Sequence, residues 1–446
     1  MSKMCNKRFW FRILILMILF AASALATSLY YNCWSWEEGG CRIPLLASLV
    51  FFVWPLSYFA LIAIGRYIFY RETPVLPPEE LPRCTVIMPA YNEGQHVFEA
   101  LASICGSDYP ADKLEIIAVN DGSIDDTLLW INRAAEKFPG RIRVVDLKQN
   151  GGKRFALYSG FRMGSGDVFV TIDSDSQVEP DALAKMVSPI VRDSRIGAVS
   201  GNVRVANSDG GAFPAMIDSG FTFAFDFIRA GQSVWGSVFC TPGALSAYRR
   251  ETVLPLLDEW RDQKFMGRPS GIGEDRALTN LELRAGKWVT LQRSALLYTN
   301  VPETYKSICR MLLRWERSNI RENFEMYRFI FRNFNWRDAR RWFMLFTLLE
   351  YSSMTLLPGV MIGFSLYNVV LTDGAVLFIT GAVTLLWASL PAAINLHRNS
   401  TKLVWFSFVY GIVHALTLFW VVPYALVTVG NSRWLTRIGA NSAGKF

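Results

Sequence analysis

The sequence predicts an α/β domain set between apolar helices, and three observations lead to that fold class. Apolar, β-branched runs alternate with helix-like stretches through the middle of the chain, at a spacing of about 30 residues. Long apolar runs occur at both ends, each able to cross about 30 Å of hydrocarbon as a helix. The 446 residues are 51% hydrophobic with a mean hydropathy of +0.22, which is too apolar for an ordinary soluble enzyme.

Two apolar runs near the N-terminus, Ile13 to Tyr31 and Ile43 to Gly65, are predicted to span a membrane. Basic residues precede the first run and follow the second, so both outer flanks are expected in the cytosol. The sequence AASALA would suit signal-peptide cleavage, but a second span so close behind favours an uncleaved anchor. Cys33 and Cys41, in the outer loop, are a candidate disulfide; structural disulfides are not expected on the reducing, cytosolic side.

Three more apolar runs follow the central domain. The first two, Trp342 to Val370 and Ala375 to Ile394, have basic outer flanks and a non-basic link, which predicts a hairpin that crosses the membrane twice. The third, Leu403 to Val429, is interrupted by Pro423, and its residues alone allow either one crossing or a position flat at the interface.

The central domain reads as strand and helix in alternation, which predicts a parallel sheet covered by helices on both faces. Ligands bind outside the carboxyl ends of such strands. The following polar residues sit at predicted strand ends and are expected to converge on one cleft: Asn92, Glu93, Asn120, Asp121, Asp173 and Asp175. Because neither a GxGxxG after the first strand nor a GxxxxGK[ST] is present, dinucleotide redox chemistry and a P-loop NTPase lose support.

The stretch TIDSDSQ is the sharpest local signal of a site. It ends a buried strand with Asp173 and Asp175, whose charges need water or a hard cation at the strand's mouth. Carboxylate oxygens together with a nucleotide diphosphate are typical ligands of Mg²⁺ or Mn²⁺. A solvated turn capped by aspartate is the alternative, and it weakens because Asp121 ends another strand.

Two helix starts supply further candidates. GEDR places Glu274 and Asp275 at a helix N-terminus, where a capping role or a general base at the cleft edge would both fit. NGGKR places Lys153 and Arg154 at another helix start, where basic side chains and free N–H groups suit phosphate oxygens; a solvated loop is the alternative.

A basic amphipathic helix is predicted just before the later apolar runs, in the stretch CRMLLRWERSNIRE. Its four arginines share one side of that helix: Arg310, Arg314, Arg317 and Arg321. Apolar residues cover the neighbouring side, so lipid headgroups are the expected partners of this row of arginines.

Together these motifs resemble the membrane-bound processive GT-A glycosyltransferases, which include hyaluronan, chitin-oligosaccharide and cellulose synthases. The motifs DGS, DSD, GEDR and LRW occur in that family's order, and the likeness covers nearly the whole chain. Within the family, NGGKRFALYSGF, CTPGALSAYRR and the C-terminal WLTR are most similar to hyaluronan synthases and their chitin-oligosaccharide relatives. The resemblance therefore implies a GT-A (Rossmann-like) fold.

The resemblance also implies roles for individual residues. Asp121, with Tyr91, Asn92 and Glu93 nearby, would hold the uridine nucleotide, and Lys153 the diphosphate, while Arg154 is a further substrate-binding candidate. Asp175, helped by Asp173, would bind Mg²⁺ or Mn²⁺. Asp275 would be the general base, Arg314 would stabilise the diphosphate, and Trp315 would stack on the acceptor sugar. Further substrate contacts are expected from the following residues: Cys240, Glu274, Trp434 and Arg437.

The implied function is polymerisation of UDP-sugars into a β-linked polysaccharide, most of all hyaluronan from UDP-GlcNAc and UDP-GlcA, with export through the plasma or inner membrane. Chitin-oligosaccharide, alginate-like or cellulose-like synthesis, transfer to a lipid carrier, and an inactive scaffold or receptor are the alternatives. Met311 replaces a polar family residue and Leu435 a glycine, so the sugar specificity stays open. The expected partners are UDP-sugars, the growing chain and membrane lipid, with no nucleic acid.

The expected organisation has a cytosolic catalytic domain between membrane parts. If WLTR gates the cleft from the cytosol, as in the family, Leu403 to Val429 is interfacial and four spans remain. The parts are, in order, 1–71 with two transmembrane helices, 72–302 with the catalytic domain, 303–341 with amphipathic interface helices, 342–396 with two transmembrane helices, and 397–446 with the interfacial segment and gating tail.

Overall fold

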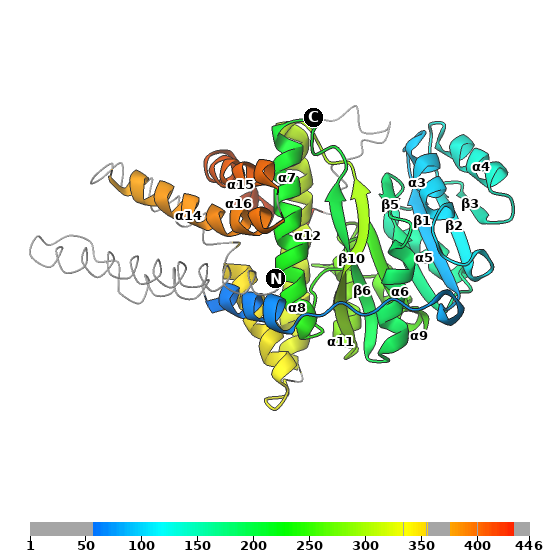
Figure 1. Cartoon of the computed structure of the whole chain (residues 1–446), viewed down its shortest axis with the longest axis horizontal. Coiled ribbons are helices and arrows are strands. Elements are labelled where there is room, and N and C mark those ends of the chain that lie inside the picture. The colour runs from blue at the N-terminus through cyan, green and yellow to red at the C-terminus, as the bar shows by residue number, and fades with distance from the viewer. Residues whose placement is uncertain (1–56, 333, 354, 356–374, 399, 432–446) are drawn as a thin grey trace, which may run out of the picture.

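The computed structural model describes residues 57–332, 334–353, 355, 375–398 and 400–431. In these ranges a mixed sheet forms the centre of an α/β domain, and helices from both ends of the described chain pack to one side of it (Figure 1). The α/β prediction is therefore confirmed. Three sets of residues from the sequence predictions lie outside the described ranges: the span Ile13 to Tyr31, the pair Cys33 and Cys41, and the C-terminal Trp434 and Arg437.

In the described part of the chain, eight strands form the large sheet in the order β3-β2-β1-β4-β7-β6-β10-β5. Their bounds are β1 Cys84–Ala90, β2 Leu114–Asp121, β3 Ile142–Leu147, β4 Val168–Ile172, β5 Ser176–Val178, β6 Ile196–Val205, β7 Leu245–Arg249 and β10 Trp288–Thr299. A small separate hairpin pairs β8, Lys264–Phe265, with β9, Arg268–Pro269.

The sheet is parallel only in part, which corrects the prediction of a parallel sheet. Strands β3, β2, β1 and β4 run parallel, as do β6 and β10. Strand β7 is antiparallel to both β4 and β6, and β5 is antiparallel to β10. Apolar runs reveal which strands are buried, but strand direction depends on the connections, which the residue pattern does not encode.

The parallel half of the sheet brings three strand ends together. In the register of β1 and β2, Ala90 pairs with Asn120, and in that of β1 and β4, Ile87 pairs with Thr171. The chain positions that follow, from Tyr91, Asp121 and Asp173 onward, therefore lie at one edge of the sheet.

Helices of the α/β domain connect and cover these strands. Helix α5 packs on β1 and β2, whereas α6 packs on β6 and β10. The bounds are α3 His96–Cys105, α4 Thr127–Lys137, α5 Lys153–Met163, α6 Ala182–Arg192, α9 Arg250–Val253, α10 Leu257–Arg261 and α11 Glu274–Arg284, with short 3₁₀ turns at Pro78–Glu80, Ala111–Lys113 and Leu254–Leu256.

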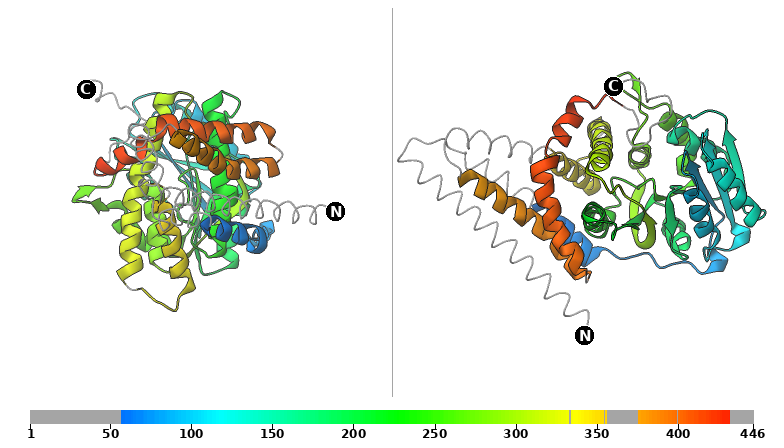
Figure 2. Two further views of the ribbon diagram at one scale, coloured as in Figure 1. Left: turned by 90° about the vertical axis from the view of Figure 1, so that its left-hand side faces the viewer. Right: turned by 90° about the horizontal axis from the view of Figure 1, so that it is seen from above.

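A second group of helices packs beside the sheet. The 28-residue helix α12, Tyr305–Arg332, contacts α11 and also α16, and the upright helix in front of it in Figure 1, α7, contacts β6, α14 and α15. Together α7 and α12 lie between the sheet and α14 to α16. The right-hand view of Figure 2 shows the same separation from above. The other members are Ser57–Phe69 with its π-turn η1 Gly65–Phe69, α7 Ala212–Phe223, η4 Ala224–Arg229, α8 Ala230–Val234, residues 339–353, α14 Ala375–His397, α15 Thr401–Val413, η6 His414–Leu418 and α16 Val421–Val427.

Within the residues that the structure describes, one helical segment is long and apolar enough to cross a membrane. This segment, Thr401–Leu418, has a mean hydropathy of 1.3, and the criterion rests on length and composition alone. It covers much of the stretch Leu403 to Val429 that the sequence places at the interface. That interfacial position and the other spans stay predictions.

The arginines of α12 do not form an exposed row, which corrects the expectation of lipid headgroups as their partners. Arg317 and Arg321 are each 2% exposed. Arg317 donates to Oγ1 of Thr428 at 2.8 Å, and Arg321 donates to Oγ of Ser270 at 2.7 Å. Because α12 has packed neighbours on more than one side, both arginines bind protein oxygens.

Candidate active site

The loops after β1 and β2 are tied to each other at the edge of the sheet. Asn92 adopts a left-handed backbone with φ +54°, and its Oδ1 accepts a hydrogen bond of 3.0 Å from the backbone N–H of Ile124. Its own N–H donates to Oγ of Ser123 at 3.1 Å. Glu93 accepts from Oγ of Ser174 at 3.2 Å, which joins the first loop to the turn after β4. Three of the predicted site segments are thereby fixed together.

Asp121, at the end of β2, is held by the turn that begins α5. Only 2% of the residue is exposed, and its Oδ1 accepts from the backbone N–H of Gly151 at 2.8 Å. Burial raises the pKa of Asp121, while the N–H groups of Gly151 and Gly152 oppose the shift. The next residue, Gly122, has φ +65°, and a Cβ there would lie 2.6 Å from N of Asn150, so only glycine permits this close approach.

The turn after β4 carries Asp173 and Asp175, as predicted from TIDSDSQ. Nζ of Lys153 lies 2.6 Å from Oδ1 of Asp173, and Oγ of Ser176 donates to Oδ1 of Asp175 at 3.1 Å. Among the residues described, no three His, Cys, Asp or Glu side chains gather as a metal-binding group. Protein carboxylates here would supply one or two ligands, which is the number usual for a cation shared with a nucleotide diphosphate.

Lys153 also reaches the first helical residue of the GEDR turn. Its Nζ lies 3.2 Å from Oε1 of Glu274, which is 4% exposed. Burial opposes the charge of Lys153, but Asp173 and Glu274 outweigh it and raise the pKa of the ammonium. Burial would raise the pKa of the Glu274 carboxyl, but the charge of Lys153 outweighs that effect and holds the pKa below its ordinary value. Lys153 and Glu274 are therefore both charged.

Asp275 lies beside this pair with its carboxylate oriented by main-chain donors. Oδ2 accepts from the N–H of Gly243 at 3.2 Å and lies 3.8 Å from Sγ of Cys240, while Oδ1 accepts from the N–H of Arg276 at 2.7 Å. Burial, and next the charge of Glu274, raises the pKa of Asp275. Burial, and next the charge of Asp275, also raises the pKa of the Cys240 thiol to about 12, so the sulfur is protonated.

The start of α11 is locked to α12 by a close contact. Gly273 has φ +77°, and a Cβ there would lie 1.7 Å from Oγ of Ser318. Arg276 donates to Oδ1 of Asn319 at 3.0 Å and to Oδ1 of Asn323 at 2.5 Å, so a second set of contacts joins the same two helices. The position of the two acidic residues of GEDR therefore depends on α12.

Arg314 and Trp315 lie on α12, about one turn before Ser318. The charge of Arg314 adds to that of Lys153 in lowering the pKa of Glu274 against the effect of burial. The ring of Trp315 is 6.1 Å from that of Phe221, and it packs at the border of a buried apolar cluster that contains Met311. Arg314 thus acts electrostatically on the GEDR turn, whereas Trp315 borders the apolar layer.

Arg154 is placed differently from the other candidates. It is 6% exposed, and its NH1 donates to the carbonyl of Trp260 at 2.7 Å and to Gln263 at 2.9 Å. Its guanidinium carbon also lies 5.5 Å from the ring centre of Trp260. This side chain fixes α5 against α10, which replaces the phosphate contact expected from NGGKR.

Three contributors to the site carry no signal that sequence reasoning used. Gly243 gives a backbone N–H to Asp275, Ser318 fills the space left by Gly273, and Nε1 of Trp260 donates to the carbonyl of Glu274 at 2.7 Å. Gly243 belongs to the stretch CTPGALSAYRR, but the contact of its N–H with Asp275 forms only in the folded loop. Trp260 lies in a segment that carries no recognised motif, and Ser318 lies in CRMLLRWERSNIRE, where the pattern of arginines gives no sign of a contact with Gly273.

Comparisons with known proteins identify the family of this chain. Residues 85–254 match glycosyl transferase family 2. An N-acetylglucosaminyltransferase of Rhizobium meliloti (strain 1021) is 33% identical over 81% of this chain and 82% of its own length. An N-acetylglucosaminyltransferase of Azorhizobium caulinodans is 33% identical over 80% of this chain and 87% of its own length.

A solved structure with a similar fold is the mannosyltransferase from Pyrobaculum calidifontis in complex with GDP-Man and Mn²⁺. It superposes with a TM-score of 0.58 at 22% identity, covering 83% of this chain and 96% of that one, which supports the fold. The chain is a glycosyltransferase that belongs to glycosyl transferase family 2, with N-acetylglucosaminyltransferases among its relatives.

Proposed function

We propose that this protein is a membrane-embedded, processive, inverting transferase that joins GlcNAc units from UDP-GlcNAc into a β-linked oligosaccharide of the chitin type. The observation that carries the proposal is the similarity, over four-fifths of the chain, to relatives named N-acetylglucosaminyltransferases. The sequence motifs alone favoured hyaluronan. The relatives instead favour the alternative, chitin-oligosaccharide synthesis, which needs UDP-GlcNAc alone. The experiment below also tests whether UDP-GlcA is required.

In the proposed reaction the edge of the parallel strands holds the nucleotide. We assign the uridine site to Tyr91, Asn92, Glu93 and Asp121. The loops that carry them are joined by the bonds from the N–H of Ile124 to Asn92 and from Ser174 to Glu93. The carboxylate of Asp121 is fixed by the N–H of Gly151, so it keeps one orientation. Rigid loops of this kind lower the ordering cost of binding.

A divalent cation fits the acidic turn after β4. Asp175, with Asp173, would hold Mg²⁺ or Mn²⁺ together with the diphosphate, and the cation would neutralise the charge of the departing UDP. Lys153 contacts Asp173 in the structure, so its ammonium is in place to move to a phosphate oxygen when the nucleotide arrives. Arg314 would add a second positive charge there.

Asp275 is the residue we assign as general base. It would take the proton from the acceptor hydroxyl as that oxygen attacks the anomeric carbon, while the bond to UDP breaks and its electron pair leaves with the diphosphate. One displacement inverts the anomeric centre. The raised pKa of Asp275, caused by burial and then by Glu274, makes its carboxylate a stronger base than an exposed aspartate.

The acceptor end of the cleft is assigned to the α12 side. Trp315 would stack on the acceptor sugar, Cys240 lies beside Asp275, and Trp434 and Arg437 would gate the cleft from the C-terminal tail. Export through the membrane is supported by the predicted spans and by the position of α7 and α12 between the sheet and α14 to α16 (Figure 1). Processivity follows if the acceptor stays in such a channel after each addition.

The test is incorporation of radiolabel by purified protein given Mn²⁺ and UDP-GlcNAc or UDP-GlcA, each alone and then paired. We expect UDP-GlcNAc alone to give oligosaccharides that chitinase degrades. A requirement for both sugars, with product cut by hyaluronidase, would replace the proposal by hyaluronan synthesis. A single sugar on a lipid would contradict processivity, and no UDP release from any UDP-sugar would favour an inactive scaffold.

A further inference from the structure

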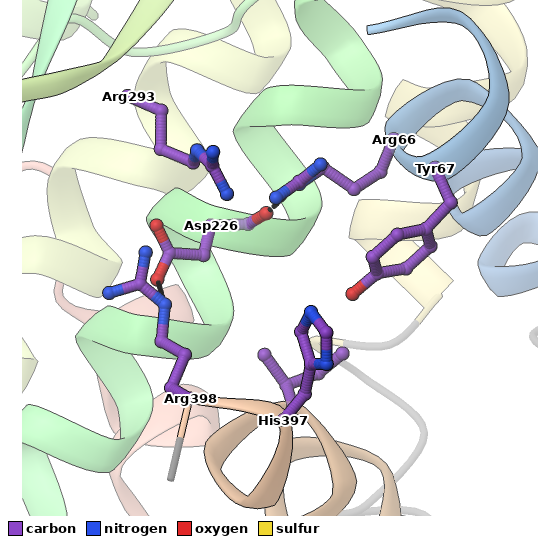
Figure 3. A pocket seen from close by; sticks show the side chains of 7 residues that line it. Arg66, Tyr67, Asp226, Arg293, His397 and Arg398 are labelled. Carbon is purple, nitrogen blue, oxygen red and sulfur yellow. Dashed lines mark hydrogen bonds and ion pairs between the residues drawn. The ribbon is translucent and has the colours of Figure 1, made fainter. Parts of the chain in front are cut away.

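A cationic cavity lies away from the cleft, where helix Ser57–Phe69, η4, β10 and the end of α14 meet. Its volume is about 340 Å³. The charged and polar side chains of its wall are shown in Figure 3: Arg66, Tyr67, Asp226, Arg293, His397 and Arg398. A second cavity of about 560 Å³ adjoins it and shares Arg293 and Arg398. The proposed transfer reaction uses none of these residues.

The charge of this wall is unbalanced. Three guanidinium groups line the first cavity with one carboxylate, that of Asp226. Asp226 is 3% exposed and already paired, because Arg204 lies 2.6 Å from its Oδ2 and Arg398 contacts the same oxygen. Glu72 and Arg204, which line the adjoining cavity, carry opposite charges and leave the net charge around the first cavity unchanged. An excess of positive charge therefore remains.

Arg66 is one source of that excess, and the sharing of one carboxylate, that of Asp226, by two arginines is the other. Arg66 donates from Nε to the backbone carbonyl of Asp226 at 2.5 Å, and Arg293 bonds through Nε to Glu72 at 2.9 Å. Figure 3 shows their terminal nitrogens approaching one another over the cavity. Burial is the main cause that lowers the pKa of Arg66, and the like charge of Arg293 lowers it further, against the opposite charge of Asp226.

A purely structural cluster would explain only part of this wall. Asp226 accounts for Arg204 and Arg398, which join η4 to β6 and to the end of α14. Glu72 pairs with Arg293, whereas Arg66 bonds to a backbone carbonyl, which carries no full charge, and faces Arg293. Paired arginine forks match the oxygens of a phosphate, which would relieve their repulsion.

We propose that this cavity binds a phosphate group through Arg66, Arg293 and Arg398. The group can come from a soluble phosphate or from the headgroup of an anionic lipid. The lipid source rests on the membrane topology proposed above, in which Ser57–Phe69 and α14 meet the cytosolic surface. A bound phosphate would tie these two helices to the catalytic domain at β10 and η4.

The test uses the full chain, purified in neutral detergent and also in nanodiscs of phosphatidylglycerol or phosphatidylcholine. Inorganic phosphate is titrated in detergent, and the thermal unfolding midpoint is followed in every sample. We expect phosphate, phosphatidylglycerol or both to raise the midpoint of the wild type. A rise with phosphate identifies a soluble ligand and a rise only with phosphatidylglycerol identifies a headgroup; no rise with either would overturn the proposal.

Matched variants separate the cavity from general attraction to a basic protein. Arg66→Gln and Arg337→Gln each remove one positive charge, and Arg337 is exposed. We expect Arg66→Gln to weaken binding by at least about tenfold, the loss of one charge-assisted bond, and Arg337→Gln to bind as the wild type. Equal binding by both variants would contradict the site. If Arg66→Gln does not fold, Arg66→Lys keeps the charge without the fork and should bind at intermediate strength.

GlcNAc transfer is measured on the same samples, so the two proposals can fail separately. Loss of phosphate binding alongside wild-type transfer in phosphatidylcholine leaves the assignment of the cleft intact. Absent transfer alongside phosphate binding that depends on Arg66 would contradict the proposed function and support the cavity.

Discussion

Nζ of Lys153 lies 2.6 Å from Oδ1 of Asp173, so a helix N-terminus supplies the cation that faces the acidic turn after β4. The same nitrogen lies 3.2 Å from Glu274, at the start of α11. One side chain therefore joins the proposed metal-binding turn to the turn that carries the proposed base. Nucleotide binding would have to redistribute these contacts.

The first prediction concerns replacement of Lys153. In Lys153→Met, Mn²⁺ alone should bind more tightly, because the ammonium no longer competes for Asp173. UDP with Mn²⁺ should bind about 10- to 100-fold more weakly, because a charge-assisted bond to the diphosphate is lost. Electron paramagnetic resonance of free Mn²⁺ and calorimetry with UDP measure the two effects. Lys148→Met, at a side chain 87% exposed, is the control, and a change of both affinities in one direction would contradict the assignment.

The second prediction concerns pH. Because the pKa of Asp275 is raised by burial and then by Glu274, kcat/KM should fall on acidification at a higher pH than for an exposed aspartate. Glu274→Gln removes a negative neighbour, so the pKa of Asp275 should fall and the acid limb should move to lower pH.

The pH profile of UDP release checks this shift. Glu259→Gln, which changes a carboxylate paired with Arg284 outside the cleft, should keep the wild-type limb. An acid limb that stays in place in Glu274→Gln, or moves upward, would argue against Asp275 as the titrating base.

The third prediction concerns Gly273. Gly273→Ala should lower transfer strongly, because its Cβ would lie 1.7 Å from Oγ of Ser318 and would push α11 away from α12. Gly267→Ala is the matched control, since Gly267 has the same φ of +77° with nothing within 4 Å of the added Cβ. Gly267→Ala should lower the free energy of unfolding only by the cost of a left-handed backbone at alanine, about 1 kcal/mol.

A double variant tests whether that contact is the cause. Ser318→Gly opens the space, so Gly273→Ala with Ser318→Gly should recover part of the lost transfer. The change in free energy of unfolding should show the same non-additivity, beyond the cost of a helical glycine. Strictly additive effects would mean that the two helices are not coupled through this pair.

Much of the fold and the candidate site could be predicted from the sequence, because they depend on local patterns. Strand and helix alternation located β1 to β4 and α3 to α6, and acidic residues at strand ends located Asp121, Asp173 and Asp175. Because β1, β2 and β4 are parallel, these strand ends lie at one edge of the sheet, and no contact between distant segments has to be known to predict this.

The remaining features depend on contacts between distant segments. The antiparallel β7 follows from its connections, and the burial of Arg317 and Arg321 follows from what α12 packs against. Arg154 follows Lys153 directly, yet the helix turns it toward Trp260 instead of the cleft. The phosphate cavity is assembled from four segments, and no single stretch of sequence encodes it.

The most direct measurement is mass spectrometry of the product made from UDP-GlcNAc and Mn²⁺ by wild type, Asp275→Asn and Asp262→Asn. The wild type and the exposed control Asp262→Asn should give a ladder of oligomers spaced by one N-acetylhexosamine. Asp275→Asn should bind UDP normally and give at least about 100-fold less product, since it lacks the base. An undiminished ladder from Asp275→Asn, or no ladder from the wild type with UDP-GlcNAc alone, would contradict the account.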